Sequence, residues 1–241
     1  MLISLSILDY EPDLAAHLNN ISESRSMSSI SSLIETKTIE RVHVDVMKPP
    51  MIPDKTTFPI NLLRAVYENL KCSIPLAAHL MVNNPYPLID DICSFMPKKE
   101  RDDFVVFIQR ESFASEEETI SALEFLKKCN FSSGICLNLS TPTDLLTKDI
   151  IEISDIVLIM TVMMGAGGQN CNEEGLRRTA LFSKMFPNKK IAVDGGINSK
   201  TIVEAKKAGA KIAVVGSFIT RNKDPVKAVF ELMQSLSTID S

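Results

Sequence analysis

The chain has 241 residues, of which 45% are hydrophobic and 23% are charged. This balance is typical of a soluble globular chain and excludes a fibre, a disordered tail and a disulfide-stapled miniprotein. The formal net charge is −4 and no cluster of Lys and Arg forms a positive face. We therefore expect neither nucleic acid nor an anionic membrane as a partner.

The cysteine pattern indicates a reducing compartment. The five cysteines are odd in number, widely spaced and never in a Cys-x-x-Cys pair. They predict reduced core residues of a cytoplasmic protein, namely Cys72, Cys93, Cys129, Cys136 and Cys171. The longest apolar stretch, residues 156–164, is too short to span a bilayer, and the amino terminus lacks the basic start of a secretory signal.

Short apolar runs alternate with longer amphipathic stretches along the whole chain, which predicts repeated strand–helix units around a parallel sheet. The predicted strands are residues 2–8, 39–47, 74–81, 104–109, 133–138, 156–161, 190–194 and 211–215. The predicted helices are residues 13–20, 60–70, 87–95, 116–128, 143–150, 173–185, 199–208 and 225–236. Eight units in this length predict an α/β fold with a single (β/α)8 TIM barrel over residues 1–241.

Two further observations bear on this prediction. A doubly wound sheet is disfavoured, because the Gly-x-Gly-x-x-Gly fingerprint is missing after the first strand. Residues 22–32 are dominated by serine and fit the pattern poorly. For them we expect a polar loop or a frayed helical extension without a function.

Histidine and acidic residues recur where predicted strands end. His43, Asp45 and Met47 alternate along the second strand and therefore point to one face, and His79 and Met81 do so on the third. The His43 and Asp45 pair alone is more often a chance hydrogen bond than a site, but the histidine on the third strand favours a site. His17, the third histidine, has no such context and is predicted to lie on the surface.

Asp194 ends the seventh strand immediately before two glycines. With the two strand-end histidines and Asp45 it makes a mixed nitrogen and oxygen set that suits a divalent transition metal. The set predicts a site for Zn²⁺, with Fe, Mn or Co as alternatives, at the carboxyl end of the barrel.

Glycine turns follow the last three strands. They are Gly165-Ala166-Gly167-Gly168-Gln169, Gly195-Gly196 and Gly216-Ser217. Any one of them can serve only a tight turn. Three in consecutive units favour a phosphate held by backbone N–H groups, as is common after the last strands of such barrels. Met47, Met81 and Met160 are either core packing or an apolar lining that excludes water.

Several segments in order along the chain carry a family resemblance. They are Ser6-Ile7-Leu8, His43-Val44-Asp45-Val46-Met47, His79-Leu80-Met81-Val82 with Asn84-Pro85, Leu137-Asn138 with Thr141-Pro142, Gly167-Gly168-Gln169, Val193-Asp194-Gly195-Gly196 and Gly216-Ser217. Together they resemble the ribulose-phosphate 3-epimerase family, and the resemblance runs from the first strand to the last. It implies a ribulose-phosphate-binding barrel that epimerises C3 of a ketose phosphate, with ribulose 5-phosphate and xylulose 5-phosphate as the pair interconverted.

The resemblance also implies residue roles. His43, Asp45, His79 and Asp194 would bind the metal, and Asp45 and Asp194 would act as acid and base around an enediolate. Contacts with the substrate would come from Ser6, His79, Met47, Met81, Met160, Gly167, Gly168, Gly195, Gly196, Gly216 and Ser217.

Departures from the family pattern leave alternatives open. Lys48-Pro49 follows Met47 where the family usually has Asp-Gly, Gln109 stands where it often has His, and Met163-Met164 and Ala166 replace its usual residues. The alternatives are an epimerase of allulose 6-phosphate and a non-catalytic phosphosugar-binding barrel. A barrel with decarboxylase or synthase chemistry would leave the paired histidines unexplained. The sequence does not decide between a monomer and a homo-oligomer.

Overall fold

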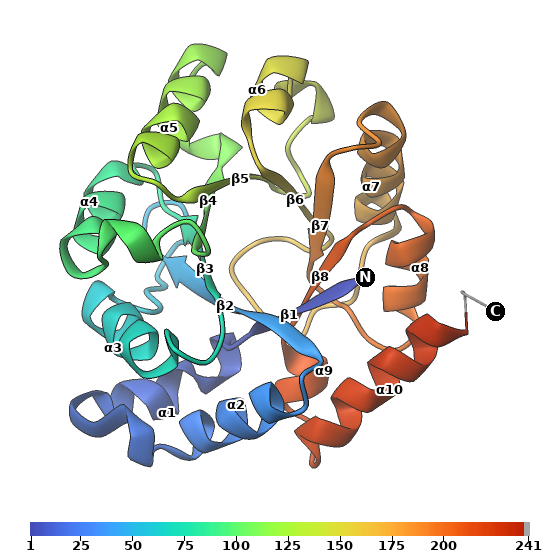
Figure 1. Ribbon diagram of the computed structural model, residues 1–241. Coiled ribbons are helices and arrows are strands. Elements are labelled where there is room, and N and C mark those ends of the chain that lie inside the picture. Colours follow the sequence, from blue (N-terminus) through green and yellow to red (C-terminus); the bar gives the residue numbers. More distant parts are fainter. Residues whose placement is uncertain (239–241) are drawn as a thin grey trace.

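The computed structural model, which describes residues 1–238, is a closed barrel of eight parallel strands joined in chain order, β1 to β8 and back to β1 (Figure 1). The fold class predicted from the sequence is therefore confirmed. The strands are β1 Leu2–Ser6, β2 Ile39–Met47, β3 Leu76–Met81, β4 Val105–Gln109, β5 Ser132–Leu137, β6 Ile156–Met160, β7 Lys190–Asp194 and β8 Ile212–Val215.

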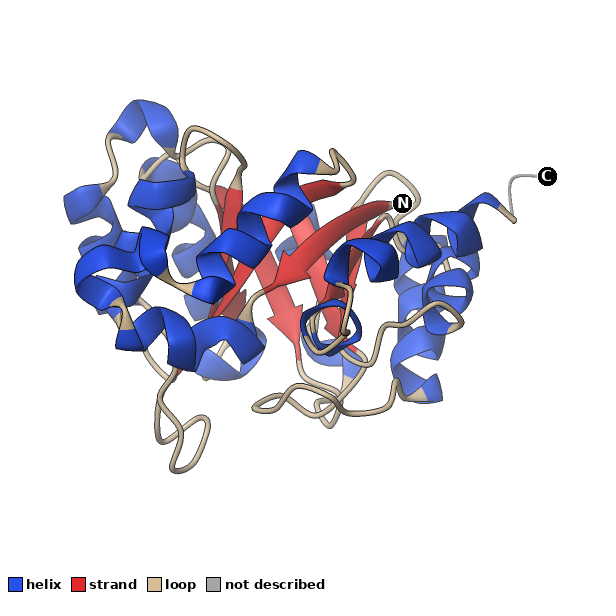
Figure 2. Ribbon diagram, turned by 90° about the horizontal axis from the view of Figure 1, so that it is seen from below, coloured by secondary structure: helices blue, strands red, loops and turns tan. Residues whose placement is uncertain are grey.

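Helices surround the barrel, and the strands run between them towards loops gathered at one end (Figure 2). The α-helices are α1 Glu11–Ala16, α2 Arg25–Glu35, α3 Ile60–Leu70, α4 Tyr86–Phe95, α5 Glu116–Lys128, α6 Lys148–Ile153, α7 Glu173–Met185, α8 Thr201–Lys207, α9 Ser217–Thr220 and α10 Pro225–Ser237. Short 3₁₀ helices are η1 Leu8–Tyr10, η2 Leu18–Glu23, η3 Lys98–Glu100, η4 Arg110–Ser112 and η5 Thr143–Leu145.

Strand β2 shows how alternation divides its residues between two sides. Its valines at positions 42, 44 and 46 belong to the large apolar core, together with residues of the surrounding helices. The alternate residues His43, Asp45 and Met47 are almost fully buried but lie outside that core. Because successive side chains of a strand point to opposite faces, these three face the barrel interior.

Strand register then brings interior residues to a common level. Asp45 is paired in register with His79, and Met47 with Met81. On the far side of the interior, Met160 of β6 is paired with Asp194 of β7. The carboxyl ends of four strands therefore present two carboxylates, an imidazole and three thioethers at one end of the barrel.

The serine-rich segment corrects a prediction. Instead of a loop or a frayed extension, it forms helix α2, which Ser24 caps by accepting a hydrogen bond from the N–H of Met27 at 3.0 Å. Met27, Ile30 and Leu33 recur every three residues and are buried on one face. This apolar face overrides the modest helix propensity of serine.

Several element boundaries also differ from the sequence predictions, among them the first strand, which ends at Ser6 instead of Leu8. Helix α1 ends at Ala16, and the predicted continuation to Asn20 is a 3₁₀ segment with a kink at Asn20. The helix predicted over residues 143–150 is divided into η5 and α6. Helix α9, between β8 and α10, was missed because it has only four residues.

All five cysteines are free, as predicted, but they are not all core residues. Only Cys136 is buried, Cys72 is exposed, and the remaining three are half-buried. Within residues 1–238, no helix is both long enough and apolar enough to cross a membrane.

Candidate active site

Four side chains from three strands meet at the carboxyl end of the barrel. The Nε2 atom of His43 lies 3.3 Å from Oδ1 of Asp45 and 3.9 Å from Oδ2 of Asp194. The Nδ1 atom of His79 lies 3.4 Å and 3.8 Å from the same two oxygens. The predicted metal ligands are thus brought together, with one atom from each within 4.8 Å of every other.

The spacing and chemistry of this cluster fit a divalent metal ion. Ligand atoms of a tetrahedral site with bonds of about 2.0–2.1 Å lie roughly 3.3 Å apart, close to the four separations above. Both ring nitrogens of His43 and the Nδ1 atom of His79 are buried without a hydrogen-bond partner. Buried polar atoms are rarely left in this state, so the inward-facing nitrogens suit an ion as their partner.

Neighbouring side chains hold these ligands in place. The Ser6 hydroxyl donates to Oδ2 of Asp45 at 2.8 Å, which leaves Oδ1 facing the histidines. The side-chain amide of Gln109 lies 2.9 Å from Nε2 of His79. A ring that offers Nδ1 to a metal carries its proton on Nε2, and this N–H would donate a hydrogen bond to the side-chain oxygen of Gln109 in the flipped amide orientation.

The pKa values of the two carboxyl groups are shifted in opposite directions. Burial alone would raise the pKa of Asp45, but His43 and His79 beside it outweigh burial and hold that pKa well below its usual range. Burial, reinforced by the charge of Asp45, raises the pKa of Asp194 to about 7. Burial would lower the pKa of His43, but Asp45 and Asp194 raise it above its ordinary value. Asp45 is therefore an ionised group near neutral pH, whereas Asp194 can hold a proton.

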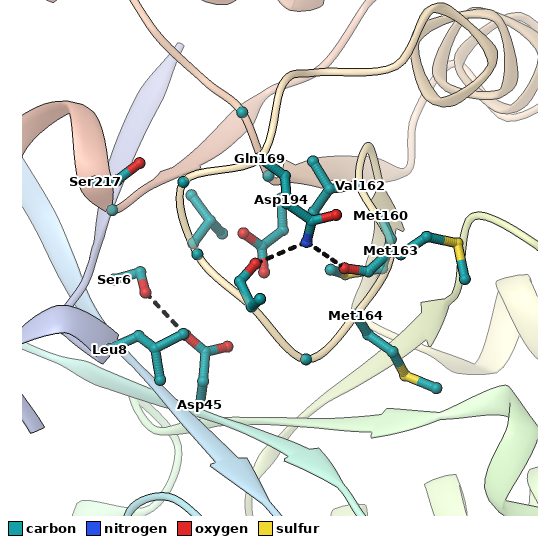
Figure 3. A pocket seen from close by; sticks show the side chains of 18 of the residues that line it. Ser6, Leu8, Asp45, Met160, Val162, Met163, Met164, Gln169, Asp194 and Ser217 are labelled. Carbon is teal, nitrogen blue, oxygen red and sulfur yellow. Dashed lines mark hydrogen bonds between the residues drawn. The ribbon is translucent and has the colours of Figure 1, made fainter. Parts of the chain in front are cut away.

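A cleft of about 580 Å³ opens above the cluster. Asp45 and Asp194 line it, and so do all the other residues predicted to contact substrate except His79, which is fully buried beneath. Met47 and Met81 pack with Ile52 on one wall, while Met160 packs with Val162 on another. Figure 3 shows Ser6, Leu8 and Ser217 across the cleft from Met163 and Met164.

The glycine turns supply backbone donors to the same cleft. Within the described residues, the N–H groups of Gly167, Gly168, Gly196, Gly216 and Ser217 donate no hydrogen bond. Gly196 has φ +64°, and a Cβ there would lie 2.1 Å from the backbone nitrogen of Cys171, so only glycine fits. Unpaired N–H groups of residues that line one cleft are suited to bind an anion.

The loop between β6 and α7 is held by polar contacts. Gln169 donates through its side-chain nitrogen to the carbonyls of Met163 and Ala166, at 2.7 and 2.8 Å (Figure 3). Lys55 reaches across from the β2–α3 loop and donates to the carbonyl of Gly165 at 2.6 Å. The glycine turn is thereby fixed as one wall of the cleft.

The departures noted in the sequence leave the cluster unchanged. Lys48 does not line the cleft, and its side chain makes no ion pair with Asp45 or Asp194 among residues 1–238. Met163 and Met164 line the cleft, and Met163 is 46% exposed. His17 lies on the surface, as predicted, 3.3 Å from Asp13.

Sequence reasoning missed three polar residues beside the glycine turn: Asp9, Lys55 and Arg221. Asp9 lines the cleft and binds Arg221, which follows α9. The only signal for Arg221 is its place four residues after Ser217. No pattern of spacing connects it with Asp9, because they are far apart in the chain.

These features define a (β/α)8-barrel enzyme whose cleft joins a cluster of two histidines and two aspartates that could hold a metal to unpaired backbone N–H groups. Residues 15–220 match the model of the ribulose-phosphate 3-epimerase family. The chain belongs to this family, whose members are isomerases that act on carbohydrates.

Individual relatives agree with this assignment. The chain is 32% identical over 194 residues to a ribulose-phosphate 3-epimerase of Helicobacter pylori, covering 78% of this chain and 82% of the relative. It is 29% identical over 195 residues to one of Schizosaccharomyces pombe, covering 81% of each. The solved structure of 3-hexulose-6-phosphate synthase from Salmonella typhimurium covers 99% of each chain with a TM-score of 0.69 at 15% identity, and shares the fold.

Proposed function

We propose that this protein is a metal-dependent 3-epimerase of ketose phosphates that interconverts ribulose 5-phosphate and xylulose 5-phosphate. The observation that carries the proposal is the pair of carboxylates, Asp45 and Asp194, within one four-residue cluster on the floor of the cleft. Family membership and the names of the relatives support the choice of a pentose phosphate.

Epimerisation at C3 requires that one proton leaves and another arrives on the opposite face of the carbon. One carboxylate removes the C3 proton and leaves an enediolate, and the other carboxyl group donates its proton to C3 from the other side. Both carboxyl groups line the cleft in which the sugar would bind, which supports this division.

We propose that His43, Asp45, His79 and Asp194 hold a divalent ion, with zinc the best fit to two imidazoles and two carboxylates. Such an ion supplies positive charge that stabilises the negative charge of the deprotonated sugar. Ser6 orients Asp45 through its hydrogen bond. Met47, Met81 and Met160 form apolar walls that exclude water from the reacting carbon.

The substrate phosphate is placed at the other end of the cleft, on the N–H groups of the three glycine turns. Their lack of internal hydrogen bonds supports this placement. We also propose that the enzyme works in the cytoplasm, because all five thiols are free.

The test is an assay of the purified protein, reconstituted with Zn²⁺, Fe²⁺, Mn²⁺ or Co²⁺, against a panel of ketose phosphates. We expect turnover of ribulose 5-phosphate, and loss of turnover when a chelator removes the metal. A preference for allulose 6-phosphate would correct the substrate. Metal-loaded protein that binds these sugars but turns over none of them would show a non-catalytic binding barrel instead.

A further inference from the structure

An ion pair between Asp9 and Arg221 lies beside the Gly167–Gly168 turn of the cleft. Arg221, one turn after Ser217, donates through Nη2 to Oδ1 of Asp9 at 2.6 Å and through Nε to Oδ2 at 3.1 Å. Thr220 also donates to Oδ2 of Asp9, at 2.7 Å. Two parallel bonds between a guanidinium and a carboxylate hold both groups in a defined orientation.

This ion pair packs directly on the glycine turn. A methyl group built on Gly168 would lie 2.6 Å from Nη1 of Arg221. One built on Gly167 would lie 3.7 Å from both Nη2 of Arg221 and Oδ1 of Asp9. The turn therefore rests against the guanidinium, and its two glycines leave no side chain between them and the ion pair.

The negative charge of Asp9 would disfavour a bound anion, and the positive charge of Arg221 neutralises it. The Asp9 carboxylate lines the cleft beside Gly167, and its side chain is only 20% exposed. An unpaired carboxylate in this position would repel a phosphate dianion bound on the same turn. Lys55 also lies near Asp9 and keeps its positive charge while it donates to the carbonyl of Gly165, but Arg221 is the cation that binds the carboxylate directly.

We propose that Arg221 is a positioning residue that makes the cleft specific for phosphorylated sugars: it neutralises Asp9 beside the Gly167–Gly168 turn, so that the backbone N–H groups there can bind a dianion. Arg221 acts through these neighbours, since it does not itself line the cleft. The inference rests on the proposed function in placing the phosphate at the glycine turns.

The experiment compares the wild type with Arg221→Ala, Asp9→Asn, the double variant and Arg221→Lys. Arg177→Ala is the control, because Arg177 is also an exposed arginine in a two-bond pair, with Glu174, but lies away from the cleft. For each protein, kcat and KM are measured with ribulose 5-phosphate, and the Kd of inorganic phosphate is measured by calorimetric titration.

We expect Arg221→Ala to raise both KM and the phosphate Kd about tenfold while kcat changes less than about twofold. Asp9→Asn should leave both constants unchanged or lower. The double variant should return to within about threefold of the wild type, because no carboxylate is left unpaired. Arg221→Lys should keep most of the affinity, and Arg177→Ala should behave as the wild type.

A phosphate Kd that Arg221→Ala leaves unchanged would overturn the inference. A double variant as weak as Arg221→Ala would do so too, because neutralisation of Asp9 would then not be the role of the arginine. A wild type that turns over no ketose phosphate would refute the proposed function instead, while the phosphate titration would still decide the role of Arg221.

Discussion

The two ends of the cleft are built from different kinds of structure. At the end with the proposed metal site (the metal end), the candidate ligands are side chains on strands β2, β3 and β7, and the most exposed of them, that of Asp194, is only 15% exposed. At the end with the proposed phosphate site (the phosphate end), the candidate donors are backbone N–H groups of the loops that follow β6, β7 and β8.

The two ends of the cleft therefore meet different structural requirements. Strand register fixes the ligand atoms to within a few ångströms of one another, which is what metal binding and proton transfer require. Glycine loops let the backbone approach an anion and depend on neighbouring side chains for their shape. Changes at the metal end should therefore lower kcat, whereas changes at the phosphate end should raise KM.

The largest effect is expected from the carboxylates. Asp45→Asn and Asp194→Asn should each lower kcat for net epimerisation by about 10³-fold or more, because each removes one of the two groups that exchange a proton with C3. Steady-state kinetics measure this effect, and Asp149→Asn on the exposed face of α6 serves as the control. Metal content must be measured in each variant, since loss of a ligand can weaken metal binding as well. A metal-loaded variant with near-normal kcat would contradict the two-carboxylate account.

Metal affinity should depend on pH. In protein freed of metal by chelation, the raised pKa of Asp194, about 7, means that this group must lose a proton before it can bind an ion. Zn²⁺ affinity should therefore fall about fivefold or more from pH 7 to pH 6, approach a tenfold fall per pH unit at lower pH, and change little well above pH 7. The raised pKa of His43 acts in the same direction. Competition titrations with a chromophoric chelator at pH 6, 7 and 8 measure the slope, and equal affinities at pH 6 and 7 would contradict the prediction.

A smaller effect, on KM instead of kcat, is expected from the glycine turns. Gly196→Ala should raise KM at least about tenfold and cost about 1–3 kcal/mol of unfolding free energy, because φ is +64° and the backbone at Cys171 cannot yield easily. Gly167→Ala is the matched control, since a Cβ at position 167 would lie 3.7 Å from its nearest neighbouring atoms. It should change KM less than about threefold. Equal KM values for the two variants would show that the turn at Gly196 does not shape the anion site.

The metal end was predictable from the sequence because strands obey a period of two. His43 and Asp45 lie two residues apart, His79 and Met81 repeat that spacing on the next strand, and Asp194 ends an apolar strand. The phosphate end was predictable only as glycine positions. The Asp9–Arg221 pair is a contact between loops from opposite ends of the chain, and no periodicity marks such contacts.

Helix α2 is the opposite case, because its residue spacing predicts a helix that its composition does not. Its serines obscured an apolar stripe of Met27, Ile30 and Leu33 that is readable at helical spacing. Serine composition predicts a polar segment there, but burial of one face decides whether such a helix forms.

The most direct test of the central claim is a turnover in deuterium oxide. With metal-loaded wild type and ribulose 5-phosphate, proton NMR of the xylulose 5-phosphate product should show one solvent deuteron at C3, because the proton removed by one carboxylate is not the one returned by the other. Asp149→Asn should give the same result. Epimerised product that retains the original C3 proton, or substrate that exchanges none in the presence of metal, would contradict a mechanism in which Asp45 and Asp194 act as an acid and base pair.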